Sequence, residues 1–422
     1  MARGLHEWLE HLESLNPDHI DMGLDRVAEV WGRLHQGPVN AKVMTVTGTN
    51  GKGTCAHAAA SMLRVAGYKT GLYTSPHLLQ FGERIQVDGQ IALPDELTGA
   101  FEQVEAARGD VGLTYFEFTT LAAFVMFLEA DLDVWVLEVG LGGRLDAVNV
   151  IDSDVAVITS IGLDHQDWLG HSLHAVATEK VGIARAGKPL VVGSAGVPPV
   201  IRKRADELGC TLYQNGDSYE AYTETHIGTP TGWSWQGTAF DGSFHLIDQI
   251  PYRHLNTDSL GAAIQAVLML GVDITDAQIR QGLGELSIPG RYQTYALQDG
   301  IQVVFDVAHN PAAGESLRDI MRAQPCEGIT RCVIAMAEAK DHAEFIATIG
   351  SEVSEWYLCN LPASRSWDGA KIRRDLLPRA MFFPQPSIAV ANAVTRSRPG
   401  DRVLVVGSFM LLAAVMGSEE LV

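Results

Sequence analysis

The sequence predicts an α/β protein in which a phosphate-loop (P-loop) domain with a doubly wound, mostly parallel sheet is followed by a smaller Rossmann-like α/β domain. Short β-branched runs alternate with amphipathic helical stretches, which is typical of parallel strands covered by helices on both faces. The chain has 422 residues, more than one hydrophobic core usually serves. The alternation stops at Ile288-Pro289-Gly290-Arg291 and then begins again, which indicates a second domain.

The first domain contains the longer series of predicted elements. β-branched runs predict strands at residues 42–46, 133–139, 154–159 and 189–192. Apolar residues at helical spacing predict crossover helices at residues 54–66, 119–130 and 173–186. Gly, Trp, Thr and Ser dominate residues 224–243, which predicts an irregular insertion of short antiparallel strands or loops.

A helix at residues 258–270 precedes the break, and the Pro289-Gly290 pair predicts an interdomain hinge. We therefore expect a P-loop domain at residues 1–287 and a smaller C-terminal domain at residues 288–422. The second domain should place strands near residues 301–305, 332–335, 356–359 and 402–406, separated by helices.

Composition excludes several classes of function. The longest apolar helical run, residues 121–128, is too short to cross a bilayer, and the opening residues lack the apolar stretch of a secretory signal. A net charge of −20 without a compact Lys/Arg run argues against a nucleic-acid partner. Five scattered cysteines without a C-x-x-C pair predict reduced thiols. We expect a cytoplasmic protein that binds neither membrane nor nucleic acid.

The strongest chemical signal is a predicted strand that runs into a glycine-rich turn and then a helix. The turn reads Gly48-Thr49-Asn50-Gly51-Lys52-Gly53-Thr54. Glycines let main-chain N–H groups converge on phosphate oxygens, the helix N-terminus adds a favourable dipole, and Lys52 can reach the outer phosphates. The alternative is an ordinary glycine-rich turn with a solvated lysine, but the flanking strand and helix both fit a phosphate loop.

This loop departs from the usual G-x-x-x-x-G-K-[ST] form. Val46 stands where the first glycine belongs, and Gly53 follows the lysine, so the usual Mg²⁺-binding hydroxyl is displaced. Ser75, which lies at the end of the next strand, is the candidate replacement among oxygen ligands. The alternative for Ser75-Pro76 is a turn that only begins a loop.

Two further strand ends carry polar groups to the same edge of the predicted sheet. Glu138 can bind Mg²⁺ directly or through water, or else be a charged strand end facing solvent. His165 can be a neutral metal ligand or a hydrogen-bonded loop side chain. Lys180 lies on what reads as an exposed, salt-bridged helix face, and its spacing alone gives it no special role.

Seven motifs then occur in order: G-T-N-G-K-G-T, T-S-P-H-L, E-V-G-L-G-G-R-L-D-A, L-D-H-Q-D-W-L-G, E-K-V-G-I-A-R, P-G-R-Y and F-D-V-A-H-N-P. From about Asp21 to Phe409 the chain resembles the bifunctional bacterial folylpolyglutamate synthase/dihydrofolate synthase family, relatives of the muramyl-peptide ligases. The resemblance implies a muramyl-ligase-like P-loop domain. It also implies a monomeric, ATP- and Mg²⁺-dependent ligase that adds L-glutamate to dihydropteroate and to reduced folates through an acyl phosphate.

The resemblance assigns roles to matching residues. Gly48 to Thr54 would cradle ATP, and Ser75 with Glu138 would hold one Mg²⁺. His165 with Lys180, the latter as a carbamate formed with CO₂, would hold a second Mg²⁺. The catalytic set implied is Lys52, Glu138, His165 and Lys180, and further nucleotide contacts are implied for Asn256, Arg291, Asp306 and His309.

Substrate contacts are implied for Asp21, Met22, Gly23, Leu24, Arg84, Thr114, Phe116, Leu145, Asp146 and Ala147. Met22 replaces the usual leucine and preserves its volume. Ala339 and Met410 stand where the family commonly places aspartate and histidine, which bears on the glutamate site and not on phosphoryl transfer.

Three rival classes would keep the same loop. They are a muramyl-peptide-type ligase acting on another carboxylate, a phosphate-loop kinase, and a nucleotide-binding switch without turnover. ADP release that depends on both dihydropteroate and glutamate would separate the predicted ligase from all three.

Overall fold

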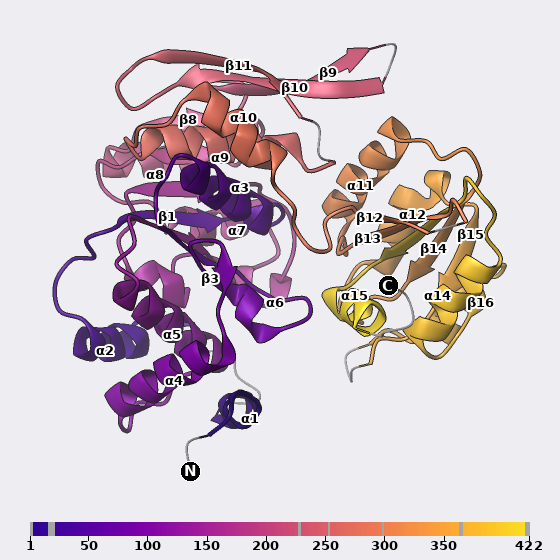
Figure 1. Ribbon diagram of the computed structural model, residues 1–422, viewed down its shortest axis with the longest axis horizontal. Helices are drawn as coiled ribbons and strands as arrows, with labels where there is room; N and C mark the ends of the chain where they lie inside the picture. Colours follow the sequence, from indigo (N-terminus) through magenta and orange to yellow (C-terminus); the bar gives the residue numbers. More distant parts are fainter. Residues whose placement is uncertain are drawn as a thin grey trace. The chain divides into compact units, whose positions relative to one another are not determined.

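The computed structural model describes residues 3–15, 22–226, 229–251, 254–297, 299–362 and 366–417. The chain divides into two compact units. The first contains Met1–Glu224 and Gly232–Leu286, and the second contains Thr225–Thr231 and Ser287–Val422. Each unit is built around its own sheet (Figure 1).

The first unit alternates strands with helices. Its strands are β1 (Lys42–Thr47), β2 (Thr70–Tyr73), β3 (Ile85–Val87), β4 (Gln90–Ile91), β5 (Val134–Glu138), β6 (Val155–Ile158), β7 (Leu190–Val192), β8 (Leu212–Gln214), most of β9 (Glu220–His226), most of β10 (Thr229–Thr238) and β11 (Phe244–Ile250). Its α-helices are α1 (Leu5–Leu15), α2 (Asp25–Leu34), α3 (Lys52–Val65), α4 (Pro94–Arg108), α5 (Tyr115–Glu129), α6 (Gln166–Leu169), α7 (Leu173–Val181), α8 (Val200–Leu208), α9 (Thr257–Met269) and α10 (Asp276–Gly284). Two 3₁₀ turns, η1 (Phe81–Arg84) and η2 (Ala147–Val150), follow β2 and β5.

The main sheet of this unit has the strand order β4-β3-β2-β5-β1-β6-β7-β8. From β2 through β8 neighbouring strands run parallel, and β3 and β4 form an antiparallel edge. The predicted mostly parallel sheet is therefore confirmed. Because parallel strands all end at the same edge, the loops after β1, β2, β5 and β6 meet there.

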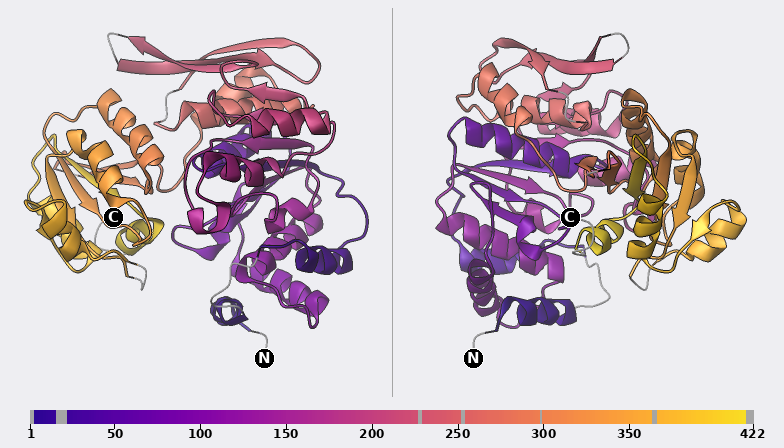
Figure 2. Two further views of the ribbon diagram at one scale, coloured as in Figure 1. Left: turned by 180° about the vertical axis from the view of Figure 1, so that it is seen from behind. Right: turned by 45° about the vertical axis from the view of Figure 1, so that its right-hand side comes forward.

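Helices cover both faces of this sheet (Figures 1 and 2). The helices α3, α9 and α10 pack against one another on one face, and α1, α2, α4 and α5 pack together on the other. The helix α5 is buried nearly all round, and a capping box at Thr114 and Glu117 fixes its start. The core therefore lies between α5 and the centre of the sheet, where Trp135 stacks on Phe124.

Helix α7 ends at Val181, five residues before the predicted end at residue 186. The main-chain N–H of Arg144 donates to the Glu179 carbonyl at 2.9 Å, so this carbonyl near the end of the helix is hydrogen-bonded to the loop after β5. Arg144 also approaches Gly182 so closely that a Cβ there would lie 2.4 Å from the arginine Cβ. The loop after β5 therefore ends this helix, a contact that local periodicity cannot reveal.

The predicted insertion of short antiparallel strands or loops is a three-stranded sheet with the order β11-β10-β9, in which β10 and β11 pair antiparallel. It is longer than the interval 224–243, because β9 begins at Glu220 and β11 ends at Ile250. The side chain of Trp235 is fully buried and lies 3.4 Å from the Cβ position of Gly261 in α9. The buried Trp235 side chain thus packs this sheet against α9.

The second unit contains a sheet with strand order β12-β13-β17-β14-β15-β16, parallel except for β12. Its strands are β12 (Gln293–Ala296), β13 (Gln302–Asp306), β14 (Thr330–Ile334), β15 (Glu355–Leu358), β16 (Met381–Phe382) and β17 (Arg402–Val406). Its helices are α11 (Pro311–Ala323), α12 (His342–Ile349), η3 (Gly350–Glu352), α13 (Gly369–Asp375), α14 (Pro386–Thr395) and α15 (Phe409–Met416). The predicted smaller Rossmann-like sheet is confirmed.

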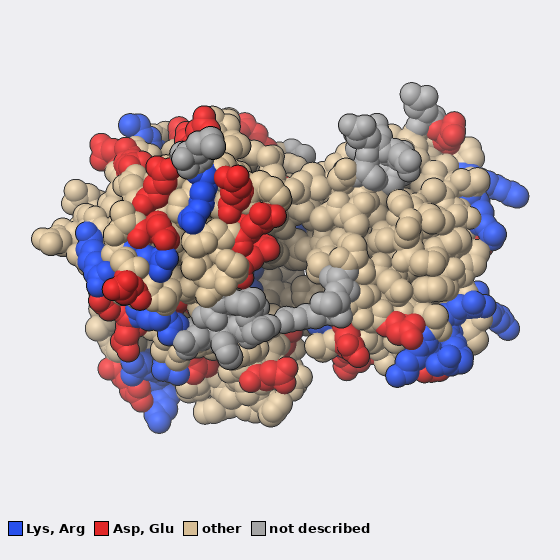
Figure 3. Space-filling model, turned by 90° about the horizontal axis from the view of Figure 1, so that it is seen from below, with Lys and Arg blue, Asp and Glu red and all other residues tan. Residues whose placement is uncertain are grey.

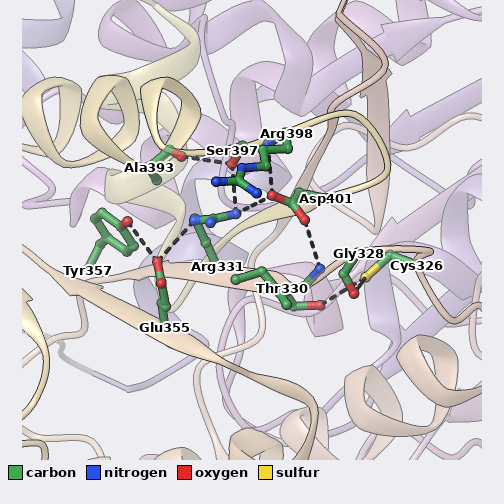
Figure 4. A network of polar contacts seen from close by, with 11 residues as sticks. Cys326, Gly328, Thr330, Arg331, Glu355, Tyr357, Ala393, Ser397, Arg398 and Asp401 are labelled. Carbon is green, nitrogen blue, oxygen red and sulfur yellow. Dashed lines mark hydrogen bonds and ion pairs between the residues drawn. The ribbon is translucent and has the colours of Figure 1, made fainter.

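A polar network fastens this second sheet (Figure 4). Arg331 of β14 donates to Asp401 at 2.5 Å and to Glu355 at 3.0 Å, and only 8% of the Arg331 and Asp401 side chains is exposed. Asp401 also accepts main-chain N–H groups of Ile329 and Arg398. The buried ion pair is thus fully hydrogen-bonded, as a buried charge requires.

No helix within the described ranges is both long and apolar enough to span a bilayer. Acidic and basic side chains both occur on the face drawn in Figure 3.

Candidate active site

The glycine-rich loop connects β1 to α3. Gly51 caps the helix in the left-handed conformation, with φ of 83°, and Lys52, Gly53 and Thr54 form the first turn of α3. The N–H groups of this first turn have no acceptors within the helix. A strand, a sharp turn and a helix N-terminus therefore stand in the order that phosphate binding needs.

Two glycines of this loop touch neighbouring elements too closely for any other residue. A Cβ on Gly48 would lie 1.9 Å from Oγ1 of Thr159, and a Cβ on Gly51 would lie 2.1 Å from Oγ of Ser259. Thr159 follows β6 and Ser259 lies in the first turn of α9. The loop is therefore seated between the end of β6 and the start of α9.

Hydrogen bonds hold the loop in this seat. The hydroxyl groups of Thr159 and Ser160 donate to the Asn50 carbonyl at 2.7 and 3.0 Å, and the Asn50 N–H donates back to Ser160 at 2.9 Å. Thr49 exchanges two hydrogen bonds with Gly162. Thr159 and Ser160 were not among the predicted site residues, although two hydroxyl residues at the end of a predicted strand were a usable signal.

Two lysines meet at the first glycine of the loop. The Lys52 ammonium donates to the Gly48 carbonyl at 3.0 Å, and Lys180 of α7 donates to the same oxygen at 2.9 Å. Only 4% of Lys180 is exposed. Burial and the nearby charge of Lys52 lower the pKa of Lys180 to about 7. The expectation that Lys180 lies on an exposed helix face is therefore wrong, because α7 packs against the loop.

The acid at the end of β5 is also buried, with 4% of Glu138 exposed. Glu138 pairs in register with Val46 of β1, and its carboxylate accepts the Ser75 N–H at 3.1 Å. The alternative of a solvent-facing strand end is thus excluded. Glu138 and Ser75, predicted as partners, lie side by side at the strand edge.

His165 precedes α6 in a left-handed conformation, with φ of 51°. Its neighbour Asp164 raises the pKa of Lys180 by its negative charge, against the larger effect of burial. The residues after β6 thus belong to the same charged surroundings as Lys180.

Asn256 caps α9 beside the glycine-rich loop. Its Oδ1 accepts the N–H of Ser259 at 2.8 Å and the Ser259 hydroxyl at 2.9 Å. Since the same hydroxyl lies against Gly51, the structure brings Asn256 to the loop through Ser259.

Several of the predicted substrate residues lie close to the loop that follows β5. The Phe116 ring of α5 lies 2.6 Å from the Cβ position of Gly140, two residues after Glu138, so only glycine fits there. Met22 lies within 3.4 Å of the Cβ position of Gly142. Thr114 is the N-cap residue of α5. Leu24, which follows Gly23, is the N-cap residue of α2. Asp21 lies outside the described residues.

Asp146 stands between Leu145 and Ala147 and caps η2. Its carboxylate accepts the N–H groups of Leu141 and Val148 at 2.9 and 3.1 Å. Burial raises the pKa of Asp146 to about 7, and hydrogen bonds from Leu141 and Val148 oppose this shift. The carboxyl therefore shapes the loop after β5 from within and titrates near neutrality.

Arg84 lies at the end of η1, and its carbonyl accepts the N–H of Thr74, the residue that follows β2, at 2.9 Å. Its Nε donates to Nδ1 of His77 at 2.8 Å, and its guanidinium stacks over the rings of Phe81 and Tyr115. Burial and the charge of Arg84 lower the pKa of His77.

The remaining predicted nucleotide residues belong to the second unit. Asp306 accepts main-chain N–H groups of Tyr292 and Ala308 at 2.8 Å each, and burial raises its pKa, opposed mainly by the charge of Arg291. The Arg291 guanidinium lies 5.2 Å from the centre of the Phe409 ring. His309 forms a hydrogen bond with the Val307 carbonyl at 2.8 Å. Arg291, just before β12, and Asp306, the last residue of β13, thus interact through their opposite charges.

Both parts of the chain are similar to domains of known proteins. Residues 46–229 match the Mur ligase middle domain, and residues 290–409 match the Mur ligase, glutamate ligase domain. Dihydrofolate synthase/folylpolyglutamate synthase of Escherichia coli is 39% identical over 98% of this chain and 95% of its own length.

Solved structures agree with this similarity. E. coli FolC in complex with DHPP and ADP superposes with a TM-score of 0.92 at 39% identity, covering 99% of this chain and 97% of that chain. The bifunctional folylpolyglutamate synthase/dihydrofolate synthase of Yersinia pestis, complexed with AMPPNP and Mn ion, gives a TM-score of 0.89 at 39% identity and 98% coverage of both chains. A structure of such an enzyme with Mn, AMPPNP and L-glutamate bound gives the same values.

The glycine-rich loop at the ends of the parallel strands, together with the two matched domains, identifies an ATP-dependent, amide-forming ligase of the Mur ligase class. Within that class, the chain belongs to the dihydrofolate synthase/folylpolyglutamate synthase family. This similarity favours a folate ligase over the muramyl-peptide alternative.

Proposed function

We propose that this protein joins L-glutamate to dihydropteroate, forming dihydrofolate, and to the γ-carboxylate of reduced folates, forming folylpolyglutamates. Support comes from relatives that are named dihydrofolate synthase/folylpolyglutamate synthase, and from a structure of such an enzyme with Mn, AMPPNP and L-glutamate bound. The observation that carries the proposal is the meeting of Lys52, Lys180, Glu138 and the glycine-rich loop at one strand edge.

The triphosphate of ATP lies on the main-chain N–H groups of Gly48 to Thr54, with Lys52 on its outer phosphates. To reach them, the Lys52 ammonium exchanges the Gly48 carbonyl for phosphate oxygens. Asn256 contacts the nucleotide from the start of α9. Arg291, Asp306 and His309 contribute from the second unit.

Two Mg²⁺ ions are proposed at this edge. Ser75 and Glu138 hold the first, and His165 and a carbamylated Lys180 hold the second. Within the described ranges no three His, Cys, Asp or Glu side chains form a metal cluster, so hydroxyl, carbamate and phosphate oxygens must complete each set. When bound, the ions neutralise charge on the phosphates.

Carbamylation of Lys180 fits its surroundings. Only a neutral amine reacts with CO₂, and burial beside Lys52 favours the neutral amine. The carbamate carries a negative charge, which replaces the repulsion from Lys52 by attraction. Lys180→Ala should lose activity and regain part of it with added acetate, whereas Lys188→Ala, which removes an exposed lysine, should need no rescue.

The pterin end of the substrate lies against Asp21 to Leu24, Thr114, Phe116 and Leu145 to Ala147. The support is that Met22, Phe116 and Asp146 converge on the loop that follows Glu138. The substrate carboxylate then points toward the strand edge.

In the first step a carboxylate oxygen attacks the γ-phosphorus, the bond to the β-phosphate oxygen breaks, and ADP leaves. In the second, the neutral amine of glutamate attacks the acyl carbon, phosphate leaves with the bonding electrons, and the nitrogen loses a proton. Lys52 and the loop amides stabilise charge on the transferring phosphoryl group by fixed position.

The proposed enzyme acts as a monomer in the cytoplasm, where folates and ATP occur together.

An ADP-release assay tests the proposal. We expect release with dihydropteroate or tetrahydrofolate only when L-glutamate, ATP and Mg²⁺ are all present, with amide product equal to ADP formed. A phosphorylated product without glutamate would indicate a kinase, and ATP binding without turnover would indicate a switch. Turnover with a nucleotide-linked muramyl acid instead would replace the folate assignment by the muramyl one.

A further inference from the structure

Asn149 is a buried residue of η2 that forms hydrogen bonds to both sides of a close contact between two chain segments. Only 6% of Asn149 is exposed. Its Nδ2 group donates to the Arg144 carbonyl at 3.0 Å and to the Gly182 carbonyl at 3.3 Å. Arg144 belongs to the loop after β5, and Gly182 follows α7. One amide group therefore joins this loop to the end of the helix that carries Lys180.

The two segments touch main chain to main chain at this point. A Cβ on Gly143 would lie 3.0 Å from the Glu179 carbonyl oxygen and 3.1 Å from the Lys180 carbonyl oxygen. A Cβ on Gly182 would lie 2.4 Å from the Arg144 Cβ. Because no side chain separates the segments here, hydrogen bonds decide how the loop lies on the helix.

Arg185 holds Asn149 in place. Its Nη2 donates to Oδ1 of Asn149 at 2.9 Å and to the Asn149 carbonyl at 2.8 Å, and its Nη1 donates to the Ile183 carbonyl at 3.0 Å. Its Nε pairs with Asp152. Both polar atoms of the Asn149 side chain thus have partners, as burial requires. Arg185 ends the E-K-V-G-I-A-R motif and has no part in the proposed reaction.

The loop that Asn149 holds carries Asp146, a proposed substrate residue. The Asn149 N–H donates to the Asp146 carbonyl at 2.9 Å, and the Asp146 N–H donates to the Gly143 carbonyl at 3.2 Å. Lys180 is held separately, on the Gly48 carbonyl. A displaced loop would therefore move Asp146 relative to Lys180.

We propose that Asn149 is a positioning residue for the substrate: it fixes the loop of Asp146 against α7, and Arg185 fixes Asn149. The inference rests on the proposed function, in which this loop contacts the pterin. Dihydropteroate and tetrahydrofolate share the pterin end, so the affinity for both substrates depends on Asn149. ATP lies on the glycine-rich loop, and its affinity does not.

Asn149→Asp tests the two donated hydrogen bonds in the full-length enzyme. The substitution keeps the shape and the oxygen that Arg185 binds, but it places a carboxylate oxygen opposite the carbonyls of Arg144 and Gly182. KM for dihydropteroate and KM for tetrahydrofolate should each rise roughly 10-fold, which corresponds to the loss of one or two net hydrogen bonds. KM for ATP and kcat should each change by less than about threefold.

Calorimetry measures the same effect without turnover. In the presence of ADP and Mg²⁺, dihydropteroate should bind the Asn149→Asp enzyme roughly 10-fold more weakly than the unaltered enzyme. ADP alone should bind both enzymes equally. An unchanged dissociation constant for dihydropteroate would overturn the inference.

Arg185→Gln and Arg33→Gln form a matched pair that separates positioning from stability. Each removes an arginine that donates to main-chain carbonyls, and Arg33 donates to those of Ala107 and Arg108 at the end of α4. Both variants should unfold at a lower urea concentration than the unaltered enzyme. Only Arg185→Gln should also raise KM for dihydropteroate, by roughly 3- to 10-fold.

Arg185 is partly exposed, so Arg185→Gln can be measured even if Asn149→Asp does not fold. An equal rise in KM for Arg185→Gln and Arg33→Gln would mean that KM follows general stability, and the positioning role would be wrong.

The remaining outcomes separate the two proposals. An unaltered enzyme that releases no ADP with either substrate contradicts the proposed function itself. An unaltered enzyme that uses both substrates, together with unchanged kinetics of Asn149→Asp, contradicts only the role of Asn149. A rise in KM for ATP as large as that for dihydropteroate would also contradict this role, because the whole strand edge would then have moved.

Discussion

At the scale of single residues, the main-chain carbonyl of Gly48 is where the phosphate loop and α7 meet. Lys52 reaches it from the loop itself and Lys180 from far along the chain. The two ammonium ions repel each other, and the charges of Asp146 and Asp164 offset part of this repulsion. Loss of the charge on Lys180, or the arrival of an anion, would relieve the rest. Both changes are part of the proposed reaction, which makes this contact informative about function.

Lys52→Ala should lower kcat/KM for ADP release roughly 100-fold or more, because a fixed cation on the transferring phosphoryl group is lost. The fold should persist, with unfolding free energy changed by less than about 1 kcal/mol, since the ammonium lies in the loop, where it donates to the Gly48 and Thr49 carbonyls, and not in the hydrophobic core. Steady-state kinetics and urea unfolding measure the two effects. Lys42→Ala, at the exposed opposite end of β1, is the control and should leave kinetics intact.

Asp146 predicts a pH dependence of stability. Its pKa is raised from 3.8 to about 7 by burial, so between these values the folded state binds more protons than the unfolded state. The stability from this group is present at low pH and is lost as pH rises through 7. Relative to Asp146→Asn, which cannot titrate, the protein should lose on the order of 2 kcal/mol of unfolding free energy between pH 5 and 8.

Urea unfolding of both proteins across this range measures the difference. The variant should also lose a further, pH-independent amount of stability, because the asparagine amide cannot accept both N–H groups that Asp146 accepts. If the whole difference between the two proteins stayed the same from pH 5 to pH 8, the raised pKa of Asp146 would be contradicted.

At the scale of elements, the strand ends explain why polar residues distant in sequence meet. The loops after β1, β2, β5 and β6 all leave the same edge of the sheet, and α9 closes against the first of them. Sequence periodicity predicted β17 with its observed bounds and β1 to within one residue. The predicted end of α7 was wrong, because the Arg144 N–H donates to the Glu179 carbonyl and the helix ends there.

Gly51 and Gly67 flank the same helix, α3, and provide a matched pair of substitutions. Both have positive φ, 83° and 94°, so alanine at either costs about 1 kcal/mol of backbone strain. Only at Gly51 would the new Cβ also meet Ser259, since the space around Gly67 is open. Gly51→Ala should therefore abolish ATP binding in calorimetry, while Gly67→Ala binds ATP normally. Equal affinity in both variants would show that the loop adapts.

At the scale of the whole molecule, the two units have separate sheets, and the network around Arg331 belongs to the second alone. Asp401→Ala would leave Arg331 buried with one acid fewer and release two main-chain N–H groups. We expect a loss of about 3 kcal/mol in the stability of this unit. Hydrogen exchange should accelerate in β13, β14 and β17 and stay unchanged in β1, β5 and β6.

The exposed pair Arg322–Glu352 of the same unit is the control. Arg322→Ala should cost at most about 1 kcal/mol. Faster exchange in both units of the Asp401→Ala variant would mean that the units unfold together.

The sequence by itself determined the fold class, the phosphate loop and the family, because these depend on local periodicity, glycine placement and ordered motifs. It also named Ser75 with Glu138, since strand order in a parallel sheet brings strand ends together. Only the tertiary structure decided that Lys180 is buried on the Gly48 carbonyl, and that Thr159 and Ser259 hold the loop in place. Burial and desolvation arise from elements far apart in the chain, and no local pattern records them.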